Sequence, residues 1–337
     1  MTVFTSPADF VAAIETLRPP DADSRAAAAR RQAELTKPPG SLGRLEEIAL
    51  FMAGWQGRAR PRLDHGRVVV FAGNHGVAAR GVSAFPPEVT AQMVANFRSG
   101  GAAINALAAA AGLALDVVAL DLDQPTADFT AMPAMDADDC LAAINAGAAA
   151  VAPDLDLLVP GEMGIANSTA AAALCAASFG GTARDWVGPG TGVEGTALAA
   201  KIAAVDAALL RHRTEATDPF ETLRRLGGRE IAAIAGAVVG ARRHGVPVLL
   251  DGFIGTAAVA PLAAHRPGIV DHCLAGHVSA EPGHVRLLAR LGLAPLLALD
   301  MRLGEASGGA VAAMLVRAAL AAHDGMATFA EAGVATA

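Results

Sequence analysis

A glutamate in a glycine-rich turn is the residue of this sequence best suited to accept a proton. Glu305 lies within 304–309, between the apolar run 296–299 and an alanine-rich stretch expected to be helical over 306–322. A carboxylate between the end of a strand and the start of a helix lies where open α/β sheets bind their ligands. We therefore expect Glu305 to be the catalytic carboxylate and the other strand ends to complete the site.

Small residues and isolated polar groups follow most of the expected strands. These strand ends are 73–76, 160–169, 251–256, 275–279 and 304–305. Glycine lets a backbone approach a ligand closely, and polar residues at a helix start leave free N–H groups and a positive dipole end for an anion. Five such ends at one edge of a sheet would form a concave site rich in backbone donors.

Two glycine-containing stretches are candidates for binding a phosphate. In 161–169, Glu162 precedes a helix opened by the polar residues 167–169, although ordinary helix capping explains this pattern equally well. The stretch 187–195 holds four glycines but matches neither the dinucleotide nor the Walker A pattern, so a plain loop stays open. Lys201 follows it and would reach back to a phosphate, although a solvated lysine is the commoner outcome.

Histidines offer two further functional interpretations. His75, after the first expected strand, is the better candidate, although a histidine there would equally well hold the turn by hydrogen bonds. A metal site would draw on His272, His277 and His284 together with Asp271 and Glu281. The spacing of these residues matches no established metal-binding pattern. We therefore expect neither a metal nor a cofactor.

Composition argues against several classes of protein. Apolar residues make up 53% of the 337 residues, and the net charge of −7 without a Lys/Arg cluster argues against nucleic acid or an anionic membrane as a partner. Three isolated cysteines without CxxC spacing argue against disulfides and structural zinc. The N-terminus lacks a signal-peptide pattern, and the apolar stretch 101–120 contains Asn105 and Asp116. We expect a soluble cytoplasmic protein.

Alternating strands and helices predict the fold class. Apolar runs that are typical of buried strands cover 68–72, 115–122, 155–159, 246–250, 269–274 and 294–299. Helical patterns between them cover 87–97, 101–111, 137–151, 168–177, 194–210, 229–240, 256–264 and 306–322. This alternation predicts an α/β fold with a Rossmann-like, mostly parallel sheet flanked by helices.

The N-terminal segment is expected to be helical. Ser6 and Pro7 form a helix start, a second helix covers 23–35, and the prolines and glycines of 37–43 then impose a turn. We interpret this turn as a structural hinge, in which Lys37 would equally well be a solvated charge. The expected domains are a small helical subdomain over 1–60, an α/β domain over 61–325, and a C-terminal segment over 326–337 that packs on the small subdomain through its helix 327–332.

Seven motifs together resemble those of one enzyme family. In chain order they are KPPGSLGRLEEIA (37–49), FAGNHGVAARGVSAFPPEVTAQMVANF (71–97), GEMGIANSTAAAAL (161–174), VGPGTGV (187–193), LLDGFIGTAA (249–258), AGHVSAEPGH (275–284) and LDMRLGEASGGA (299–310). By these motifs the chain resembles the nicotinate-nucleotide–dimethylbenzimidazole phosphoribosyltransferase family. The resemblance implies that nicotinate mononucleotide gives its phosphoribosyl group to a benzimidazole nitrogen with inversion, and that the chain forms a homodimer.

The implied reaction requires one carboxylate. The pyridinium leaving group departs neutral at its nitrogen without a general acid, whereas the attacking benzimidazole must lose the proton of its other ring nitrogen. General-base assistance is typically worth about 10²–10⁴-fold, and a carboxylate also favours the positive charge that develops on the ribose. By resemblance, Glu305 is the general base and Glu162 is the family's second acidic residue.

The resemblance also assigns the binding residues. The nucleotide phosphate and ribose would contact Gly164, Ile165, Ala166, Asn167, Ser168, Gly190, Thr191, Gly192, Lys201 and Asp251, and the base pocket would include Ser83, Phe85, Gln92, Met163 and Leu303. Two residues depart from the family's pattern. Phe85 replaces the usual tyrosine, which leaves the preferred base open. Ala166 replaces a commoner glycine, and we do not expect it to adopt a positive φ easily.

Three functions remain open at this stage. They are this phosphoribosyltransferase, a relative that uses other bases such as purines or phenolics, and a non-enzymatic nucleotide-binding protein. Phe85 keeps the second possibility open. The presence of both Glu162 and Glu305 argues against the third, because a binding module needs no isolated carboxylate facing an anionic nucleotide.

Overall fold

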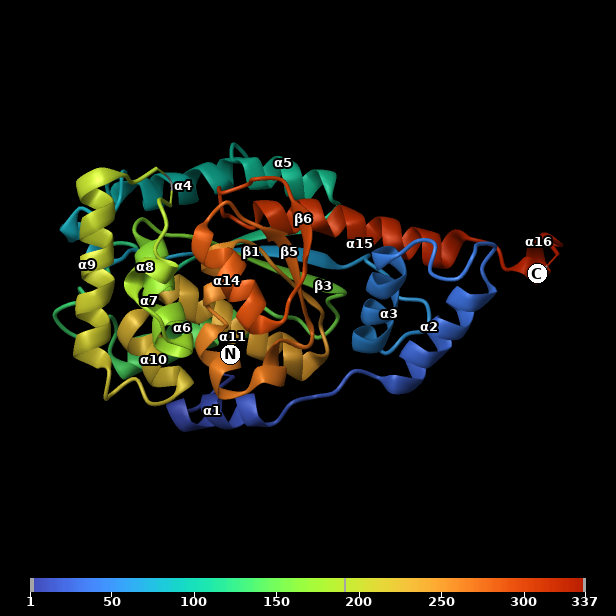
Figure 1. Cartoon of the computed structure of the whole chain (residues 1–337), viewed down its shortest axis with the longest axis horizontal. Helices are drawn as coiled ribbons and strands as arrows, with labels where there is room; N and C mark the ends of the chain where they lie inside the picture. The colour runs from blue at the N-terminus through green and yellow to red at the C-terminus, as the bar shows by residue number, and fades with distance from the viewer. Residues whose placement is uncertain (1–2, 191, 336–337) are drawn as a thin grey trace.

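A six-stranded parallel sheet forms the centre of the computed structural model, which describes residues 3–190 and 192–335 (Figure 1). Its strands are β1 Gly66–Ala72, β2 Ala114–Ala119, β3 Leu157–Met163, β4 Val248–Leu250, β5 Cys273–Val278 and β6 Pro295–Ala298. They lie in the order β2-β1-β3-β4-β5-β6. The order reverses direction between β1 and β3, and in open α/β sheets ligands bind beyond the carboxyl ends of the strands at such a point. The predicted α/β fold class is confirmed.

Helices connect and cover the strands. In the α/β part they are α4 Glu88–Ser99, α5 Ala103–Ala110, α6 Ala137–Ala149, α7 Asn167–Phe179, α8 Ala183–Trp186, α9 Gly195–His212, α10 Pro219–Leu226, α11 Arg229–His244, α12 Phe253–Ala257, α13 Ala260–His265, α14 Pro282–Leu291 and α15 Ser307–Gly325. The helix predicted over 256–264 is instead divided into α12 and α13, because Pro261 stands at the start of the second helix. The prediction omits α8, α10 and α14, whose periodic patterns are short.

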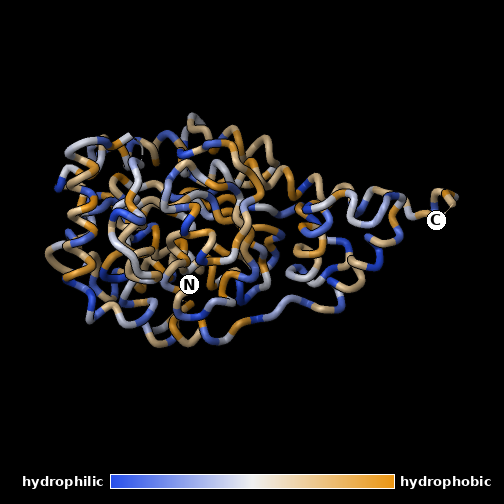
Figure 2. Tube along the Cα trace, viewed as in Figure 1, coloured by the Kyte–Doolittle hydropathy of each residue, from blue (hydrophilic) through white to orange (hydrophobic). Residues whose placement is uncertain are grey.

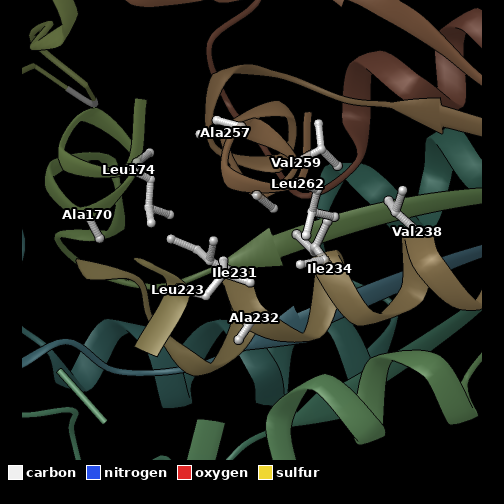
Figure 3. Packing of buried hydrophobic residues seen from close by; sticks show 14 of the residues in the cluster. Ala170, Leu174, Leu223, Ile231, Ala232, Ile234, Val238, Ala257, Val259 and Leu262 are labelled. Carbon is white, nitrogen blue, oxygen red and sulfur yellow. The ribbon is translucent and has the colours of Figure 1, made fainter. Parts of the chain in front are cut away.

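The two faces of the sheet are covered by different helices. Val69 and Phe71 of β1 belong to a core that α6, α7, α10 and α11 cover, whereas the alternate residues Val68 and Val70 belong to a core under α3, α5 and α15 (α3 is Arg44–Gln56). Figure 3 shows part of the first core, where side chains of α7, α10, α11 and α13 gather beside the sheet. Burial on both faces explains why the strands have continuous apolar sequences.

Two strands, β3 and β5, extend further toward their carboxyl ends than predicted, and both extensions bring polar residues into the sheet. β3 continues to Met163, so that Glu162 lies within the strand, paired in register with Phe71 of β1. β5 begins at Cys273 and includes His277. Gly161 allows the turn before α15 to lie against this strand, because a Cβ there would lie 2.7 Å from the backbone nitrogen of Ala306. The start of α15 therefore packs directly on the end of β3.

The N-terminal helices divide between two places. α1 (Pro7–Glu15) begins with the predicted Ser6 cap, and its buried side chains join the core beside α10. α2 (Ala22–Glu34) and α3 pack together and project from the body beside α15 and the last helix, α16 (Phe329–Ala332) (Figure 1). The prediction groups α1 with α2 and α3, whereas the structure places α1 against the body.

An ion pair stabilises the turn between α2 and α3. Lys37 is buried, and its Nζ lies 2.8 Å from the Glu46 carboxylate, so it is not a solvated charge. Arg44, at the start of α3, donates hydrogen bonds to the backbone oxygens of Ala294 and Pro295, beside β6. The motif 37–49 therefore connects the projecting helices to the edge of the sheet.

Hydropathy follows the same division of the molecule. Figure 2 shows hydrophilic residues at frequent intervals along α2, while much of the hydrophobic chain runs through the body. Across residues 3–190 and 192–335, no helix combines the length and the apolar character needed to cross a membrane.

Candidate functional site

A cleft of about 840 Å³, its open mouth included, lies beyond the carboxyl ends of β3, β4, β5 and β6. Of the residues that the sequence predicts for the site, it brings together Ser83, Glu162, Met163, Gly164, Ile165, Ala166, Asn167, Ser168, Gly190 and Leu303. Lining residues outside that prediction include Phe253, His277, Ser279, Glu281, Arg302 and Gly304. The cleft therefore gathers strand ends that are distant in sequence.

Other predicted site residues lie outside the lining of this cleft. Lys201, Asp251 and Glu305 are buried immediately behind its wall, in contact with lining residues or their neighbours. Phe85 and Gln92 are exposed, and Gly192 is also exposed. Thr191 lies outside the described residues.

The turn from β3 to α7 contains a left-handed alanine. Ala166 precedes the helix with φ 75°, so the expectation that it would avoid a positive φ is wrong. The conformation costs about 1–2 kcal/mol in an L-residue, and the surrounding contacts hold it: Thr90 Oγ1 accepts a 3.2 Å hydrogen bond from the N–H of Ile165. This turn directs the start of α7 into the cleft.

Glu162 is the carboxylate that lines the cleft directly. Its Oε2 accepts a 2.5 Å hydrogen bond from Nδ2 of Asn167, the first residue of α7. Burial raises its pKa well above the usual range, and the charges of Asp251, Glu230 and Glu305 act in the same direction, while the Asn167 bond opposes them. Glu162 therefore binds a proton more readily than an ordinary glutamate.

The turn before α15 contains two left-handed residues in succession. Glu305 has φ 62° and Ala306 has φ 68°. Asp251, which follows β4, holds this turn: its carboxylate accepts a 3.1 Å hydrogen bond from the N–H of Ala306 and a 2.8 Å bond from that of Gly309. Strained residues of this kind persist where surrounding contacts fix them, often at active sites.

The Glu305 carboxyl group has the pKa of a proton acceptor near neutrality. Burial raises its pKa to about 7, with a further contribution from the charge of Asp251. Only 5% of Glu305 is exposed, and its Oε2 forms no hydrogen bond with any described residue. Gly304, next to it, lines the cleft. A ring N–H that reached this carboxylate would find an acceptor with a free oxygen.

A buried lysine lies beneath the glycine loop 188–190. Nζ of Lys201, a residue that is 1% exposed, donates 2.9 Å hydrogen bonds to Oγ of Ser168 and to the backbone oxygen of Gly188. Burial lowers its pKa to about 8, while the charge of Glu281 raises it. We call Ser168, 188–190, Lys201 and Glu281 the lysine region. Its buried cation suits a phosphate.

The histidines support the structure around the cleft. His75, buried at the end of β1, pairs with Glu230 through Nε2 at 2.6 Å. Nε2 of His277 lies 3.6 Å from Asp251 Oδ1, and His284 bonds to Ser279. No group of three or more His, Cys, Asp or Glu side chains within 3–190 and 192–335 is arranged to hold a metal ion.

Comparison with known proteins agrees with the motifs. A family model described as "Phosphoribosyltransferase" matches residues 17–334. The chain is 65% identical over 335 residues to the nicotinate-nucleotide–dimethylbenzimidazole phosphoribosyltransferase of Novosphingobium aromaticivorans, with 99% of each chain covered. It is 58% identical over 332 residues to the enzyme of that name from Cereibacter sphaeroides, with 98% of each covered.

A solved structure has the same fold. The crystal structure of CobT from Thermus thermophilus matches with a TM-score of 0.88 and 45% sequence identity, over 94% of this chain and 100% of that one. A second Thermus thermophilus structure, of nicotinate-nucleotide–dimethylbenzimidazole phosphoribosyltransferase, matches with a TM-score of 0.87 and 43% identity. The chain belongs to the nicotinate-nucleotide–dimethylbenzimidazole phosphoribosyltransferase family.

Proposed function

We propose that this chain transfers the phosphoribosyl group of nicotinate mononucleotide to 5,6-dimethylbenzimidazole, giving α-ribazole 5′-phosphate and nicotinate. The observation that carries the proposal is the pairing, around one cleft, of a buried carboxyl group whose pKa is about 7 with a buried lysine beneath a glycine loop. The lysine region binds the phosphate, and Glu305 accepts a proton from the base.

The proposed reaction balances without a cofactor. One ring nitrogen of the benzimidazole forms a bond to the anomeric carbon, and the bond from that carbon to the nicotinate nitrogen breaks. The pyridinium takes up the electron pair and leaves neutral at nitrogen, while the other ring nitrogen gives its proton to Glu305. Because the pKa of Glu305 is about 7, a substantial fraction of this group is ionised and ready to accept the proton at neutral pH.

The ribose lies between the lysine region and Glu305 in this proposal. Glu162 lines the cleft at the end of β3, where its buried carboxyl group would contact the sugar. Gly164, Ile165 and Asn167 border the same space and would contact the nucleotide. Asp251 supports the site from behind, through its hydrogen bonds to the turn of Glu305.

We propose that five residues contact the base: Ser83, Phe85, Gln92, Met163 and Leu303. Purine or phenolic bases remain the second candidates, because Phe85 supplies an apolar ring without a hydroxyl group. We also propose a homodimer in the cytoplasm. Exposed Val285 and Leu299, outside the proposed base pocket, support the homodimer, since a second copy would cover their apolar surface.

Product analysis tests the proposed function. The purified chain is incubated with nicotinate mononucleotide and, in parallel, with dimethylbenzimidazole, a purine, a phenolic compound or no base, and the products are separated by chromatography. We expect nicotinate release that depends on dimethylbenzimidazole, with an α-ribazole phosphate product. Release with the purine or phenolic base alone would favour the second candidate, and the absence of release with every base would contradict the proposal.

A further inference from the structure

Glu281 is a buried acid within a site that is otherwise suited to an anion. It is 6% exposed, lines the cleft and directly precedes α14. A residue in this position commonly caps its own helix, but the Glu281 side chain forms no capping bond with α14. Its carboxylate instead crosses to the glycine loop, where Oε1 accepts a 2.8 Å hydrogen bond from the N–H of Gly190.

The loop is shaped to receive this carboxylate. A side chain at Gly188 would clash with Oε2 of Glu281 and would lie 2.9 Å from Cδ of Pro282. Gly190 has φ 59°, and a Cβ on it would lie 3.4 Å from Nζ of Lys201. Two glycines therefore bring the loop close to an acid on one side and a lysine on the other.

The charge of Glu281 acts on the lysine beside the loop. Burial lowers the pKa of Lys201, and Glu281 is the charged group that opposes this change. Burial raises the pKa of Glu281 above its usual range, and the charges of Lys201 and Arg302 and the hydrogen bond from Gly190 oppose this rise. Oε2 of Glu281 forms no hydrogen bond with any described residue. The acid thus compensates the buried cation while one of its oxygens stays unpaired.

We propose that Glu281 is a positioning residue for the nucleotide phosphate: it fixes the glycine loop through the Gly190 amide and keeps Lys201 charged. This inference rests on the proposed function. Glu281 does not touch the reacting atoms, so its contribution is to nucleotide affinity. A substitution can distinguish the hydrogen bond from the charge, because a glutamine would retain the acceptor for Gly190 and lose the charge that faces Lys201.

The test compares two variants with a matched control. Glu281→Ala removes both the Gly190 acceptor and the charge, and Glu281→Gln removes only the charge, while Glu194→Gln removes an exposed charge from the end of the glycine-containing stretch 187–195. KM for nicotinate mononucleotide, KM for dimethylbenzimidazole and kcat are measured at pH 6.5 and pH 8, after turnover by the unaltered enzyme has been established. Without that turnover, it is the proposed function that fails.

We expect Glu281→Ala to raise KM for nicotinate mononucleotide by about tenfold or more at both pH values, as for loss of a hydrogen bond to a charged group. Glu281→Gln should match the unaltered enzyme at pH 6.5, where Lys201 is protonated in both. At pH 8 its KM should be about fivefold higher, because without the Glu281 charge the Lys201 pKa falls further and less of the lysine is protonated. Both kcat and the other KM should change less than about threefold, and Glu194→Gln should have no effect.

Several results would overturn this inference. An unchanged KM for nicotinate mononucleotide in Glu281→Ala would show that Glu281 does not support the phosphate site. A fall in kcat together with a rise in both KM values, equal in the two variants, would show a general structural role. If Glu281→Ala does not fold, the ratio of the Glu281→Gln and unaltered KM values decides alone, and a ratio independent of pH contradicts the proposal.

Discussion

The lysine region and the phenylalanine segment (Ser83, Phe85 and Gln92) differ in how fully they are formed before a substrate binds. Lys201 is 1% exposed and bonded to two neighbours, whereas Phe85 is 49% exposed. Within the segment, the N–H of Phe85 donates a 3.2 Å hydrogen bond to Oγ of Ser83. A preorganised lysine region lowers the cost of ordering when the nucleotide binds, while an exposed segment can adapt to the base.

The largest effect is expected at Glu305, the proposed general base. Glu305→Gln should lower kcat by about 10²–10⁴-fold, because the amide cannot accept the proton of the base. Calorimetry should still show binding of nicotinate mononucleotide, since the lysine region is unchanged. Glu162→Gln is the matched comparison, because it alters the neighbouring carboxylate without removing the proposed base. A larger loss of kcat in Glu162→Gln would reassign the general base to Glu162.

Removing the buried cation tests the preorganised lysine region. Lys201→Met keeps most of the apolar stem and should raise KM for nicotinate mononucleotide by about 10–100-fold, for loss of a charge-assisted hydrogen bond. KM for dimethylbenzimidazole should change little. Steady-state kinetics with each substrate varied in turn measures both constants. An effect confined to the KM of the base would place the phosphate elsewhere in the cleft.

The smallest effect is expected in the exposed phenylalanine segment. Phe85→Tyr adds one hydroxyl group to a ring that is half exposed, so KM for dimethylbenzimidazole should change less than about fivefold, within the range of one new hydrogen bond. When dimethylbenzimidazole and a purine compete, the ratio of their two products should change more than the rate measured with either base alone. A change in nucleotide KM would contradict the proposed separation between the two parts of the site.

Local sequence patterns predicted the framework of the site. The β-branched run 68–72 indicated a strand buried on both faces, and Ser6 with Pro7 indicated the start of the first helix. The small residues after β3, β4, β5 and β6 correctly indicated one sheet edge for the cleft, whereas the predicted strand end 73–76 after β1 does not line it. These signals are local, since each depends on the periodicity or the conformational preference of a few neighbouring residues.

Long-range contacts explain what the sequence could not predict. Lys201 has the sequence context of a solvated lysine and is buried because Ser168 and the Gly188 carbonyl surround its ammonium group. Ala166 adopts a positive φ because contacts such as that of Thr90 hold its turn. Glu281 carried a signal, an acid preceding a proline at a helix start, but its contact with Gly190 depends on two segments 91 residues apart.

The pH dependence of catalysis tests the role of Glu305 most directly. At saturating nicotinate mononucleotide, kcat/KM for dimethylbenzimidazole is measured from pH 5.5 to 8.5 for the unaltered enzyme and for Glu305→Gln. Because the raised pKa of Glu305 is about 7, the carboxyl group already carries a proton below that pH and cannot accept another. The ratio of the two enzymes' kcat/KM values cancels protonation of the free base. We predict that the value of the unaltered enzyme divided by that of Glu305→Gln falls about tenfold for each unit by which the pH is lowered below 7. A ratio that is constant across the range would contradict the assignment of Glu305 as the general base.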